Sequence, residues 1–563
     1  MRMVVVGGVA TGMSAAARAR RLDEDAEIIV FEKGPHVSCA DCGLPYYVGG
    51  EIEDRGALTV QTPRSLKAAL NLDVRVNHEV VDVDPEARTV TVKSRAGETV
   101  EPYDALVLAP GADAAKPPIP GIDSARVQNL KDVGDAIRMR ELVEEGAEDA
   151  VVIGAGFIGL EIAEALKAQG LTVTIVELAP HVLPNAEPEI AARITTEARR
   201  LGIRVETRTS VTGIVPGEYK DTVRLSNGKA LPADIIVTSI GVRPATDLFE
   251  KVGVKTEKGA IVVDEHGRTN LPDVWAGGDA TMTTDPITGA RRIVPLAGPA
   301  NRSGRLIADD IMRGEDDVEP RRISQPLGTA ILRMGDLTMA LTGATRESLD
   351  AAGIGYHTIN LHPFQHAGYF PGAEQVHMVV HFAEDDGRVL GAQAVGADGV
   401  DKRIDVLATA IRGGLRVDDL IDVDLSYSPP YGSAKDPINI VGMFGENVLT
   451  GVTDPWYAED LAEAMEEALI LDCRTESEFA GGHLPDALNV PHTEVRERLD
   501  EIREAADGRP IRVHCQSGFR SYLAERILKQ NGFDVKNLSG GMLTLVAAMN
   551  GGLAPKVELE TGN

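Results

Sequence analysis

The chain has 563 residues, and its 57 Lys and Arg against 86 Asp and Glu give a formal net charge of −29. A chain of this length predicts about three to five domains, and so acidic a protein lacks the basic surface that a nucleic-acid backbone needs. No apolar run reaches the ~20 residues that cross a membrane, so no membrane partner is expected. Four cysteines are too few for a secreted disulfide framework, which predicts a cytoplasmic protein. No metal site is predicted.

The N-terminus has the order of a dinucleotide-binding fold. Residues 3–7 predict a buried strand that runs into a turn containing Gly7 and Gly12. A helix and a second strand follow, and Glu32 stands at the end of that strand. This arrangement places a pyrophosphate at the helix N-terminus and a ribose hydroxyl at the acid. Val9 replaces the middle glycine of the general pattern, so an ordinary strand–helix turn stays open as the alternative.

A second and more complete copy of the same pattern follows. A strand leads into Gly154, Gly156 and Gly159, a helix comes next, and another strand ends at Glu177. The acid should accept a hydrogen bond from a ribose 2′-hydroxyl and repel a 2′-phosphate, and the three residues after it include no arginine. The sequence therefore favours NADH, with NADPH as the other possibility.

Residues 269–280 resemble the segment with which flavoproteins that bind two dinucleotides close their FAD domain. The resemblance implies that Asp279 binds the ribityl chain of FAD. Because this segment lies beyond the second glycine pattern, the NAD(P)H domain is expected to be inserted into the FAD domain. The expected limits are 1–112 and 241–322 for the FAD domain and 113–240 for the inserted domain.

Cys42 lies just beyond the second predicted strand, where the chain would pass over a flavin. A cysteine there can act as a redox nucleophile that attacks a disulfide. A free thiol is only slightly ionised at neutral pH, so this role predicts a site that lowers the pKa of the thiol. The alternative is a cysteine that only packs as a small apolar side chain.

The segment 38–47 around this cysteine, Ser-Cys-Ala-Asp-Cys-Gly-Leu-Pro-Tyr-Tyr, resembles the active-site segment of the coenzyme A disulfide reductases. Rhodanese-fused members of that family reduce coenzyme A disulfide, polysulfide and persulfides with NADH. The resemblance covers residues 1 to about 446 and 456 to about 550, and it implies that Cys42 cycles through a mixed disulfide with coenzyme A. Cys39 stands where the family usually has an aromatic residue. Either it pairs with Cys42 as a dithiol or it packs, and both interpretations stay open.

Three polar residues of the first helix recur with helical spacing and share one face. From the residues alone this face is either a solvated basic stripe or a binding site. The resemblance favours a site, since it implies contacts with coenzyme A by a set of seven residues: Ser14, Arg18, Arg21, Ser38, Asp41, Asn301 and Lys435. Arginines suit the phosphates through paired N–H donors.

Residues 323–446 resemble the dimerisation domain of this flavoprotein class, which implies a homodimer. In the family, tyrosines at the positions of Tyr369 and Tyr427 reach across the dimer and donate hydrogen bonds or protons to the active-site sulfur. Without the resemblance, both would be interpreted as core tyrosines.

After a linker at 447–457, residues 458–555 resemble a single rhodanese domain. Cys515 is followed by small residues and Arg520, so the loop amides can surround a charged sulfur. Cys515 is expected to carry a persulfide that the amides and Arg520 stabilise. Cys473 is interpreted as a packed residue at a strand end. A flexible linker would leave the distance between Cys42 and Cys515 variable.

The sequence thus predicts an α/β protein with two Rossmann-like dinucleotide-binding domains, an α+β dimerisation domain and a C-terminal α/β rhodanese domain. The favoured function is reduction of coenzyme A disulfide, coenzyme A persulfide or polysulfide by NADH and FAD through Cys42, coupled to sulfane-sulfur transfer at Cys515. The alternatives are an NADH oxidase or peroxidase in which Cys42 cycles through a sulfenic acid, and a persulfide carrier or redox sensor.

Overall fold

The computed structural model describes residues 1–313 and 321–562. Part of the predicted second half of the FAD domain, residues 314–320, lies outside the described residues. The chain forms two compact units, Met1–Val176 with Ser210–Gly328 and Glu177–Thr209 with Thr329–Asn563.

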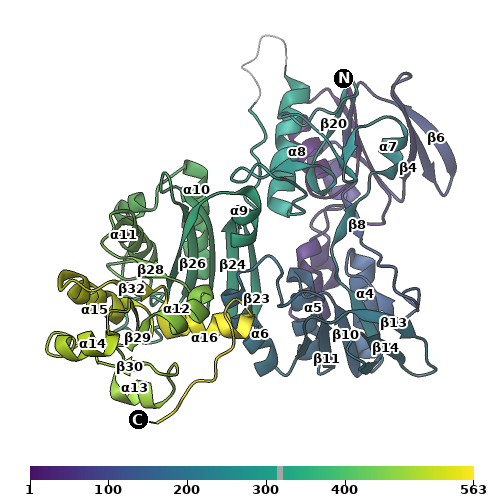
Figure 1. Cartoon of the computed structure of the whole chain (residues 1–563). Helices are drawn as coiled ribbons and strands as arrows, with labels where there is room; N and C mark the ends of the chain where they lie inside the picture. Colours follow the sequence, from purple (N-terminus) through teal and green to yellow (C-terminus); the bar gives the residue numbers. More distant parts are fainter. Residues whose placement is uncertain (314–320, 563) are drawn as a thin grey trace. The chain divides into compact units, whose positions relative to one another are not determined.

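The first unit contains a parallel sheet in the order β20–β7–β1–β2–β3 (Figure 1). Helices α1 and α8 cover one face through a core of small and aliphatic side chains, and the antiparallel strands β4, β5 and β6 cover the other. Valine and isoleucine runs buried on both faces explain why these strands are parallel and continuous. The elements are β1 (Arg2–Val6), α1 (Ala10–Leu22), β2 (Glu27–Glu32), α3 (Pro63–Leu70), β3 (Asp73–Val76), β4 (Glu79–Asp84), β5 (Thr89–Ser94), β6 (Gly97–Pro102), β7 (Ala105–Leu108), α7 (Asp247–Lys251), β20 (Val274–Ala276) and α8 (Ala297–Met312).

A second parallel sheet in the same unit contains β11, β10, β16 and β9 as neighbours. The antiparallel strands β13, β14 and β15 lie between β11 and β16 in the sequence. Its elements are β9 (Val127–Gln128), α4 (Val133–Glu144), β10 (Asp149–Ile153), α5 (Phe157–Ala168), β11 (Thr172–Val176), β13 (Val211–Val215), β14 (Asp221–Leu225), β15 (Ala230–Ala233) and β16 (Ile235–Thr238). The chain enters and leaves it through β8 (Ala112–Ala114) and β17 (Val242–Pro244), which pair antiparallel. The two connections by which the chain enters and leaves this part therefore lie side by side.

The second unit begins with α6 (Pro188–Arg200) and β12 (Arg204–Glu206) and continues with an antiparallel sheet in the order β23–β24–β27–β26–β25. Helices α10 and α11 pack on this sheet through a core that includes Phe382, Leu407 and Val441. The elements are β23 (Ala330–Met334), β24 (Leu337–Gly343), α9 (Arg346–Ala352), β25 (Tyr356–Leu361), β26 (His377–Ala383), β27 (Val389–Gly396), α10 (Val400–Gly413) and α11 (Pro437–Leu449).

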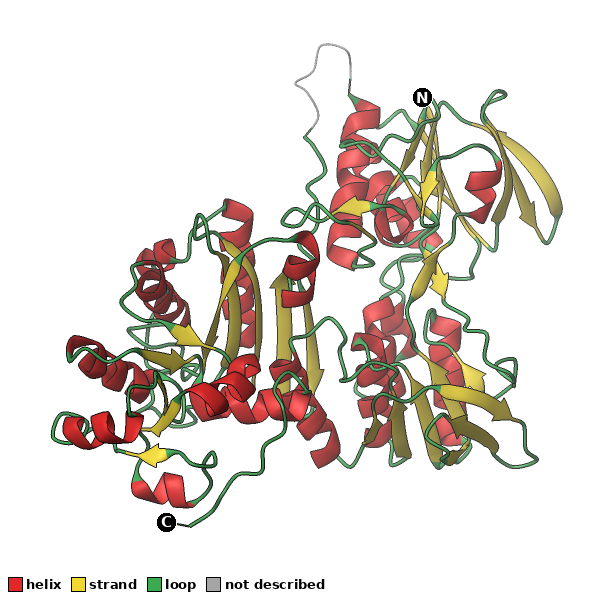
Figure 2. Ribbon diagram, viewed as in Figure 1, coloured by secondary structure: helices red, strands yellow, loops and turns green. Residues whose placement is uncertain are grey.

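The C-terminal part of this unit is a parallel sheet in the order β28–β32–β31–β29–β30 with helices around it (Figure 2). Its elements are β28 (Pro455–Trp456), α12 (Leu461–Glu467), β29 (Leu469–Asp472), α13 (Glu476–Ala480), β30 (Leu488–Asn489), α14 (Leu499–Ala506), β31 (Ile511–His514), α15 (Phe519–Gln530), β32 (Val535–Leu538) and α16 (Gly541–Gly551). Strand β28 lies within the predicted linker. Trp456 is 2% exposed and its indole N–H donates to the carbonyl of Val513 at 3.3 Å, so burial of this side chain draws the segment into the sheet.

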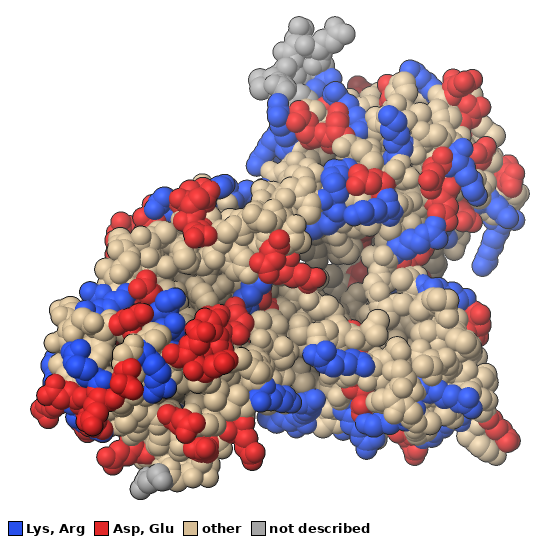
Figure 3. Space-filling view, viewed as in Figure 1, with Lys and Arg blue, Asp and Glu red and all other residues tan. Residues whose placement is uncertain are grey.

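The face drawn in Figure 3 carries acidic and basic side chains in small mixed groups. Exposed ion pairs such as Arg498–Glu501 and Arg416–Asp418 have this local character. Across residues 1–313 and 321–562, no helix is both long and apolar enough to cross a membrane.

Candidate active site

The first glycine-rich turn joins β1 to α1, and its glycines allow close backbone contacts that a side chain would prevent. Gly7 has φ +103°, and a Cβ there would lie 2.0 Å from the carbonyl oxygen of Ala109. A Cβ on Gly12 would lie 1.9 Å from the carbonyl oxygen of Gly7, so only glycine permits this close turn. The carboxylate of Glu32 accepts backbone N–H bonds from Gly8 at 2.8 Å and from Gly34 at 2.7 Å. The N-cap residue of α1, Val9, makes no side-chain hydrogen bond to the first turn, which leaves the N–H groups of that turn for an anionic ligand.

The second turn repeats this geometry between β10 and α5. Gly154 has φ +101°, and a Cβ there would lie 2.3 Å from the carbonyl oxygen of Ser239. A Cβ on Gly159 would lie 2.1 Å from the carbonyl oxygen of Gly154, whereas a Cβ on Gly156 would meet no atom within 4 Å. Glu177 directly follows β11 in the chain, and its carboxylate accepts from the backbone N–H of Ala179 at 2.7 Å.

Asp279 lies in a short 3₁₀ turn, η3 (Gly278–Ala280), which touches the start of α1. A Cβ on Gly278 would lie 2.4 Å from Oγ1 of Thr11. Burial raises the pKa of Asp279, and nearby Lys131 acts in the opposite direction. An FAD fits this arrangement. The glycine turn, the acid Glu32 and the half-buried carboxyl of Asp279 all lie near the N-terminus of α1.

Cys42 lies in the 3₁₀ turn η1 (Asp41–Gly43), ahead of α2 (Leu44–Val48), with an exposed side chain. Partial burial raises the pKa of its thiol, and the carboxylates of Asp41, Glu161 and Asp279 raise it further. The sequence predicted that the site lowers the pKa of Cys42. That prediction is wrong for the protein groups around the thiol, which raise it. The sequence showed a cysteine beside a turn but could not show that carboxylates would gather around it.

Cys39 is half-buried, and its backbone forms a bridge with Thr59. Burial, with nearby Asp41 adding to it, raises the pKa of this thiol to about 12. A thiol this hard to ionise is a poor nucleophile, which favours the packing interpretation over a reactive dithiol pair.

A cavity of about 510 Å³ opens between α1 and α8. Four of the seven predicted coenzyme A residues line it, namely Ser14, Arg21, Ser38 and Asn301. The hydroxyl of Ser14 donates to Oδ1 of Asn301 at 2.6 Å, which ties the two helices together at the cavity wall. Apolar side chains of Met13, Leu66 and Leu70 complete the lining, so the cavity offers both polar and apolar contacts to a ligand.

The other three predicted coenzyme A residues lie elsewhere. Arg18 donates to Asp309 of α8 at 2.5 Å and is not part of the cavity lining, because this neighbouring carboxylate holds it against the helix pair. Asp41 lies beside Cys42 in η1, and burial raises its pKa to about 6. Lys435 belongs to the second unit.

Two further arginines that sequence reasoning missed, Arg302 and Arg305, also line the cavity. Neither of them, nor Arg21, has an ion-pair partner among residues 1–313 and 321–562. The spacing of Asn301 and Arg305 at i and i+4 on one helix face was the available signal. Three guanidinium groups around one cavity, none of them ion-paired within the described part of the chain, make it suited to a ligand with several phosphate charges.

Replacing Arg305 by alanine should raise KM for a coenzyme A substrate roughly tenfold, because a charge-assisted hydrogen bond is worth about 1.5–3 kcal/mol. Steady-state kinetics over a range of ionic strength measures the effect, and the loss should shrink as salt rises. The control is Arg95→Ala, which removes an exposed arginine from the turn between β5 and β6. An equal KM for the Arg305 variant and wild type would contradict the assignment of this cavity.

Tyr369 and Tyr427 come from separate loops of the second unit, and the structure brings them together. Their hydroxyl oxygens lie 3.4 Å apart. The side chains are 77% and 50% exposed, so they are surface groups of the single chain and not core tyrosines. Two adjacent phenol groups held at a surface are available to another molecule or subunit.

Cys515 lies at the end of β31, where the chain turns into α15, and its side chain is fully buried. The backbone N–H of Gly518 donates to its sulfur at 3.2 Å, and the hydroxyl of Ser521 donates at 3.3 Å. A hydrogen bond from Cys473 lowers the pKa of Cys515 most, and with the serine donors it outweighs burial, giving a pKa of about 5. The loop therefore holds a thiolate at neutral pH.

The surroundings of this sulfur differ from the prediction in two residues. Arg520 forms a bidentate ion pair with Glu478, with both N–O distances 2.7 Å, and this pair lowers the pKa of Glu478 to about 2. Its charge is thus largely compensated before any persulfide forms. Cys473 is packed as predicted, but it is also the group that lowers the pKa of Cys515 most, a role that its position at a strand end did not reveal.

The rhodanese-like part is fastened to the antiparallel sheet of the same unit by buried polar contacts. The backbone N–H of Asn360 donates to Oγ of Ser539 at 3.0 Å, and Nε2 of His362 lies 2.9 Å from Oγ1 of Thr544. Arg193 of α6 donates to the carbonyl of Leu543 at 2.9 Å. These contacts fix the rhodanese-like part against the antiparallel sheet and α6 of this unit, where a flexible linker would have left its position variable.

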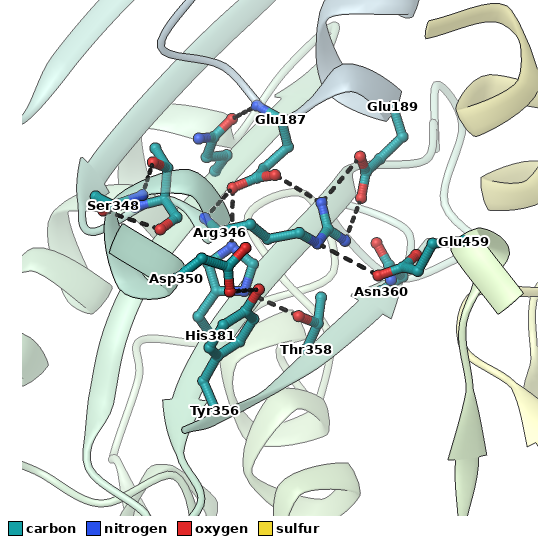
Figure 4. Close-up of polar contacts among 12 residues, drawn as sticks. Glu187, Glu189, Arg346, Ser348, Asp350, Tyr356, Thr358, Asn360, His381 and Glu459 are labelled. Carbon is teal, nitrogen blue, oxygen red and sulfur yellow. Dashed lines mark hydrogen bonds and ion pairs between the residues drawn. The ribbon is translucent and has the colours of Figure 1, made fainter. Parts of the chain in front are cut away.

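Beside them lies a buried ionic network centred on Arg346, at the start of α9 (Figure 4). Its guanidinium contacts Glu187 at 2.6 Å and Glu189 at 2.7 Å, and Glu459 lies 3.9 Å away. His381 lies 3.1 Å from Glu187. Burial alone would raise the pKa of Glu187, but Arg346 and His381 hold it below its ordinary value.

Replacing Arg346 by methionine should lower the free energy of unfolding by about 3–5 kcal/mol, because two buried carboxylates lose their counter-charge. Urea unfolding measures this, and the loss should shrink as the pH falls below the ordinary carboxylate pKa. The sign follows from the lowered pKa of Glu187: its stabilising effect is complete above the ordinary carboxylate pKa and is lost as the pH falls from there through the lowered one. The control is Arg498→Met, which breaks a partly exposed pair and should cost at most about 1 kcal/mol. Equal urea midpoints for the Arg346 and Arg498 variants would refute the contribution of the ionic network to stability.

Models of known families match three consecutive stretches of the chain. Residues 1–304 match pyridine nucleotide-disulphide oxidoreductase, residues 330–436 match the dimerisation domain of that family, and residues 457–548 match the rhodanese-like domain. The chain therefore belongs to the pyridine nucleotide-disulphide oxidoreductases and carries a C-terminal rhodanese-like domain. The predicted fold class is confirmed.

Individual relatives show which members of this family the chain resembles. The coenzyme A disulfide reductase of Staphylococcus haemolyticus is 34% identical over 446 residues, which cover 78% of this chain and 98% of that protein. An NADH oxidase of Methanocaldococcus jannaschii is 32% identical over 443 residues, which cover 78% of this chain and 97% of that protein.

Two solved structures extend over nearly the whole chain. The crystal structure of reduced Bacillus anthracis CoADR-RHD has a TM-score of 0.94 and 38% identity, covering 97% of this chain and 98% of that one. The NAD-dependent persulfide reductase from A. fulgidus has a TM-score of 0.89 and 40% identity, covering 97% and 100%. The resemblance to rhodanese-fused coenzyme A disulfide and persulfide reductases is confirmed.

Proposed function

We propose that this chain is a cytoplasmic, homodimeric flavoenzyme that uses NADH to reduce coenzyme A disulfide, coenzyme A persulfide or polysulfide. The observation that carries the proposal is the cavity between α1 and α8, where Arg21, Arg302 and Arg305 form no ion pair with any residue of 1–313 or 321–562. Its lining includes Ser38, four residues before Cys42. Coenzyme A combines several phosphate charges with a long, partly apolar arm ending in sulfur, which matches a cationic cavity with an apolar lining.

The two glycine-rich turns bind and orient the dinucleotides, with Glu32 and Glu177 as the acceptors for ribose hydroxyls. Bound FAD supplies the relay of two electrons from NADH to sulfur. The sulfur of Cys42 attacks one sulfur of the substrate and forms a mixed disulfide with coenzyme A, and the other sulfur leaves as coenzyme A thiolate or sulfide. Two electrons then cleave this mixed disulfide into the Cys42 thiolate and coenzyme A thiolate.

The raised pKa of Cys42 in the single chain means that groups beyond its own neighbours must favour the thiolate. The adjacent hydroxyls of Tyr369 and Tyr427 are suitable donors, since both are exposed and free to reach another subunit. In the proposed dimer they donate hydrogen bonds to the sulfur and protonate the leaving thiolate. The rhodanese-like domain takes up sulfane sulfur as a persulfide on Cys515.

An NADH oxidase or peroxidase is the second candidate, and the relative from Methanocaldococcus jannaschii favours it. In that reaction Cys42 cycles through a sulfenic acid. The cationic cavity between α1 and α8 has no role in it.

The test is NADH consumption with coenzyme A disulfide, coenzyme A persulfide, hydrogen peroxide and oxygen in turn. We expect turnover with the coenzyme A substrates and little with the other two. We also expect NADPH to be the weaker donor, because Glu177 repels a 2′-phosphate. Fast peroxide or oxygen turnover with none for coenzyme A substrates would replace the proposal by the second candidate. Equal efficiency of NADH and NADPH would refute the role of Glu177.

A further inference from the structure

The rhodanese-like domain holds two cysteines side by side. Strands β29 and β31 are parallel neighbours, and their last residues, Asp472 and His514, are register partners. Cys473 and Cys515 are the next residues of the two strands, and the backbone N–H of Cys473 donates to the carbonyl of His514 at 2.9 Å. Adjacent strands lie about 4.8 Å apart, within the Cα separation of about 4.4–6.8 Å that a disulfide requires.

The two side chains also face each other. Both are fully buried in the same apolar cluster, and the thiol of Cys473 forms a hydrogen bond with the sulfur of Cys515. Burial and the neighbouring Cys515 keep the pKa of Cys473 well above its usual value, so this thiol keeps its proton while Cys515 is a thiolate. A protonated thiol in contact with a thiolate can change from donor to nucleophile once the thiolate has been consumed.

We propose that Cys473 is a resolving thiol, which attacks the persulfide on Cys515, releases sulfide and leaves a Cys473–Cys515 disulfide. This inference rests on the proposed uptake of sulfane sulfur by Cys515 and adds a second fate for that sulfur. The disulfide form has no thiolate to accept sulfur, so the reaction also limits further uptake.

The step balances without an outside oxidant. Cys473 attacks the inner sulfur, Sγ of Cys515, and the bond from Sγ to the outer sulfur breaks as the new S–S bond forms. The outer sulfur leaves with the electron pair and takes the proton of Cys473, so one thiol and one persulfide anion give one disulfide and one HS⁻. The sulfane sulfur is reduced and the two cysteines are oxidised. Two equivalents of a small thiol then restore both cysteines.

The test uses the full-length Cys39→Ser, Cys42→Ser variant, in which Cys473 and Cys515 are the two remaining cysteines of the four. The reduced protein is treated with thiosulfate without NADH, desalted, and followed by intact mass and sulfide release. We expect the mass of one added sulfur first. One sulfide per chain should then appear as the mass falls to that of the reduced protein less two hydrogens, and peptide mapping should identify the Cys473–Cys515 bond.

Adding Cys473→Ser to this background should abolish both sulfide release and the disulfide, and the added sulfur should stay. Serine keeps a hydrogen-bond donor, so alkylation of Cys515 should still titrate near its original pH. Cys473→Ala, tested in parallel, should also retain the sulfur but shift that titration upward. Equal sulfide release with and without Cys473, or an added sulfur that persists in the parent variant, would overturn the inference alone. If Cys515 takes up no sulfur, the proposed persulfide chemistry fails and this inference fails with it.

Discussion

Cys42→Ser should lose NADH-dependent reduction of coenzyme A disulfide by roughly a thousandfold or more, because removing a covalent nucleophile leaves only binding and positioning. The purified variant should stay yellow, since the proposed dinucleotide site at Gly7, Gly12 and Glu32 does not include the thiol. Titration with NADH should still reduce the flavin. The long-wavelength absorption band of a thiolate next to flavin should appear in wild type and be missing in the variant.

The matched control is Cys39→Ser, which removes the other thiol of the same segment. Because Cys39 is half-buried with a pKa near 12, its loss should leave the absorption band and the coenzyme A activity in place. If Cys42→Ser kept wild-type turnover, the covalent mechanism would be refuted. If Cys39→Ser also lost the band, the two cysteines would have to act as a pair.

The parts of the fold that local sequence determines were predictable. Strands, glycine turns and terminal acids occur in fixed order, so β1, α1, β2, β10, α5 and β11 all form at the expected places. Val9 weakened the first pattern, but the requirement for glycine falls on Gly7 and Gly12, where a side chain would meet a carbonyl oxygen. The order of the two patterns along the chain predicted an inserted domain, and the antiparallel pairing of β8 with β17 is consistent with that insertion.

Side-chain contacts and pKa shifts that depend on residues far away in the sequence could not be predicted from the spacing of residues. Arg18 shares a helix face with Ser14 and Arg21, yet Asp309, which is 291 residues away, binds it. Burial and then the neighbouring carboxylate of Asp41 raise the pKa of Cys42, and Glu161 and Asp279, which come from other segments, raise it further. In the same way, Arg302 and Arg305 gain meaning only when α8 packs beside α1.

Cys515→Ala should abolish uptake and transfer of sulfane sulfur and leave reduction of coenzyme A disulfide in place, since that reaction uses the sulfur of Cys42 and not that of Cys515. Cys42→Ser should show the reverse pattern, so the two variants control each other. Sulfane uptake is measured as transfer from thiosulfate to a thiol acceptor, and disulfide reduction as NADH consumption. Loss of both reactions in Cys515→Ala would mean that the two sulfur centres are not separable.

The pH dependence of uptake follows from the same loop. Hydrogen bonds from Cys473 and Ser521 lower the pKa of Cys515 to about 5, so the reactive thiolate persists at neutral pH and is lost as the pH falls through that value. Uptake should therefore change little near neutral pH and fall to about half at a pH of about 5. Ser521→Ala removes one donor and should move this fall to higher pH. An unchanged midpoint in that variant would mean that Cys473 and the backbone amides at the start of α15 set the thiolate's stability without the serine hydroxyl.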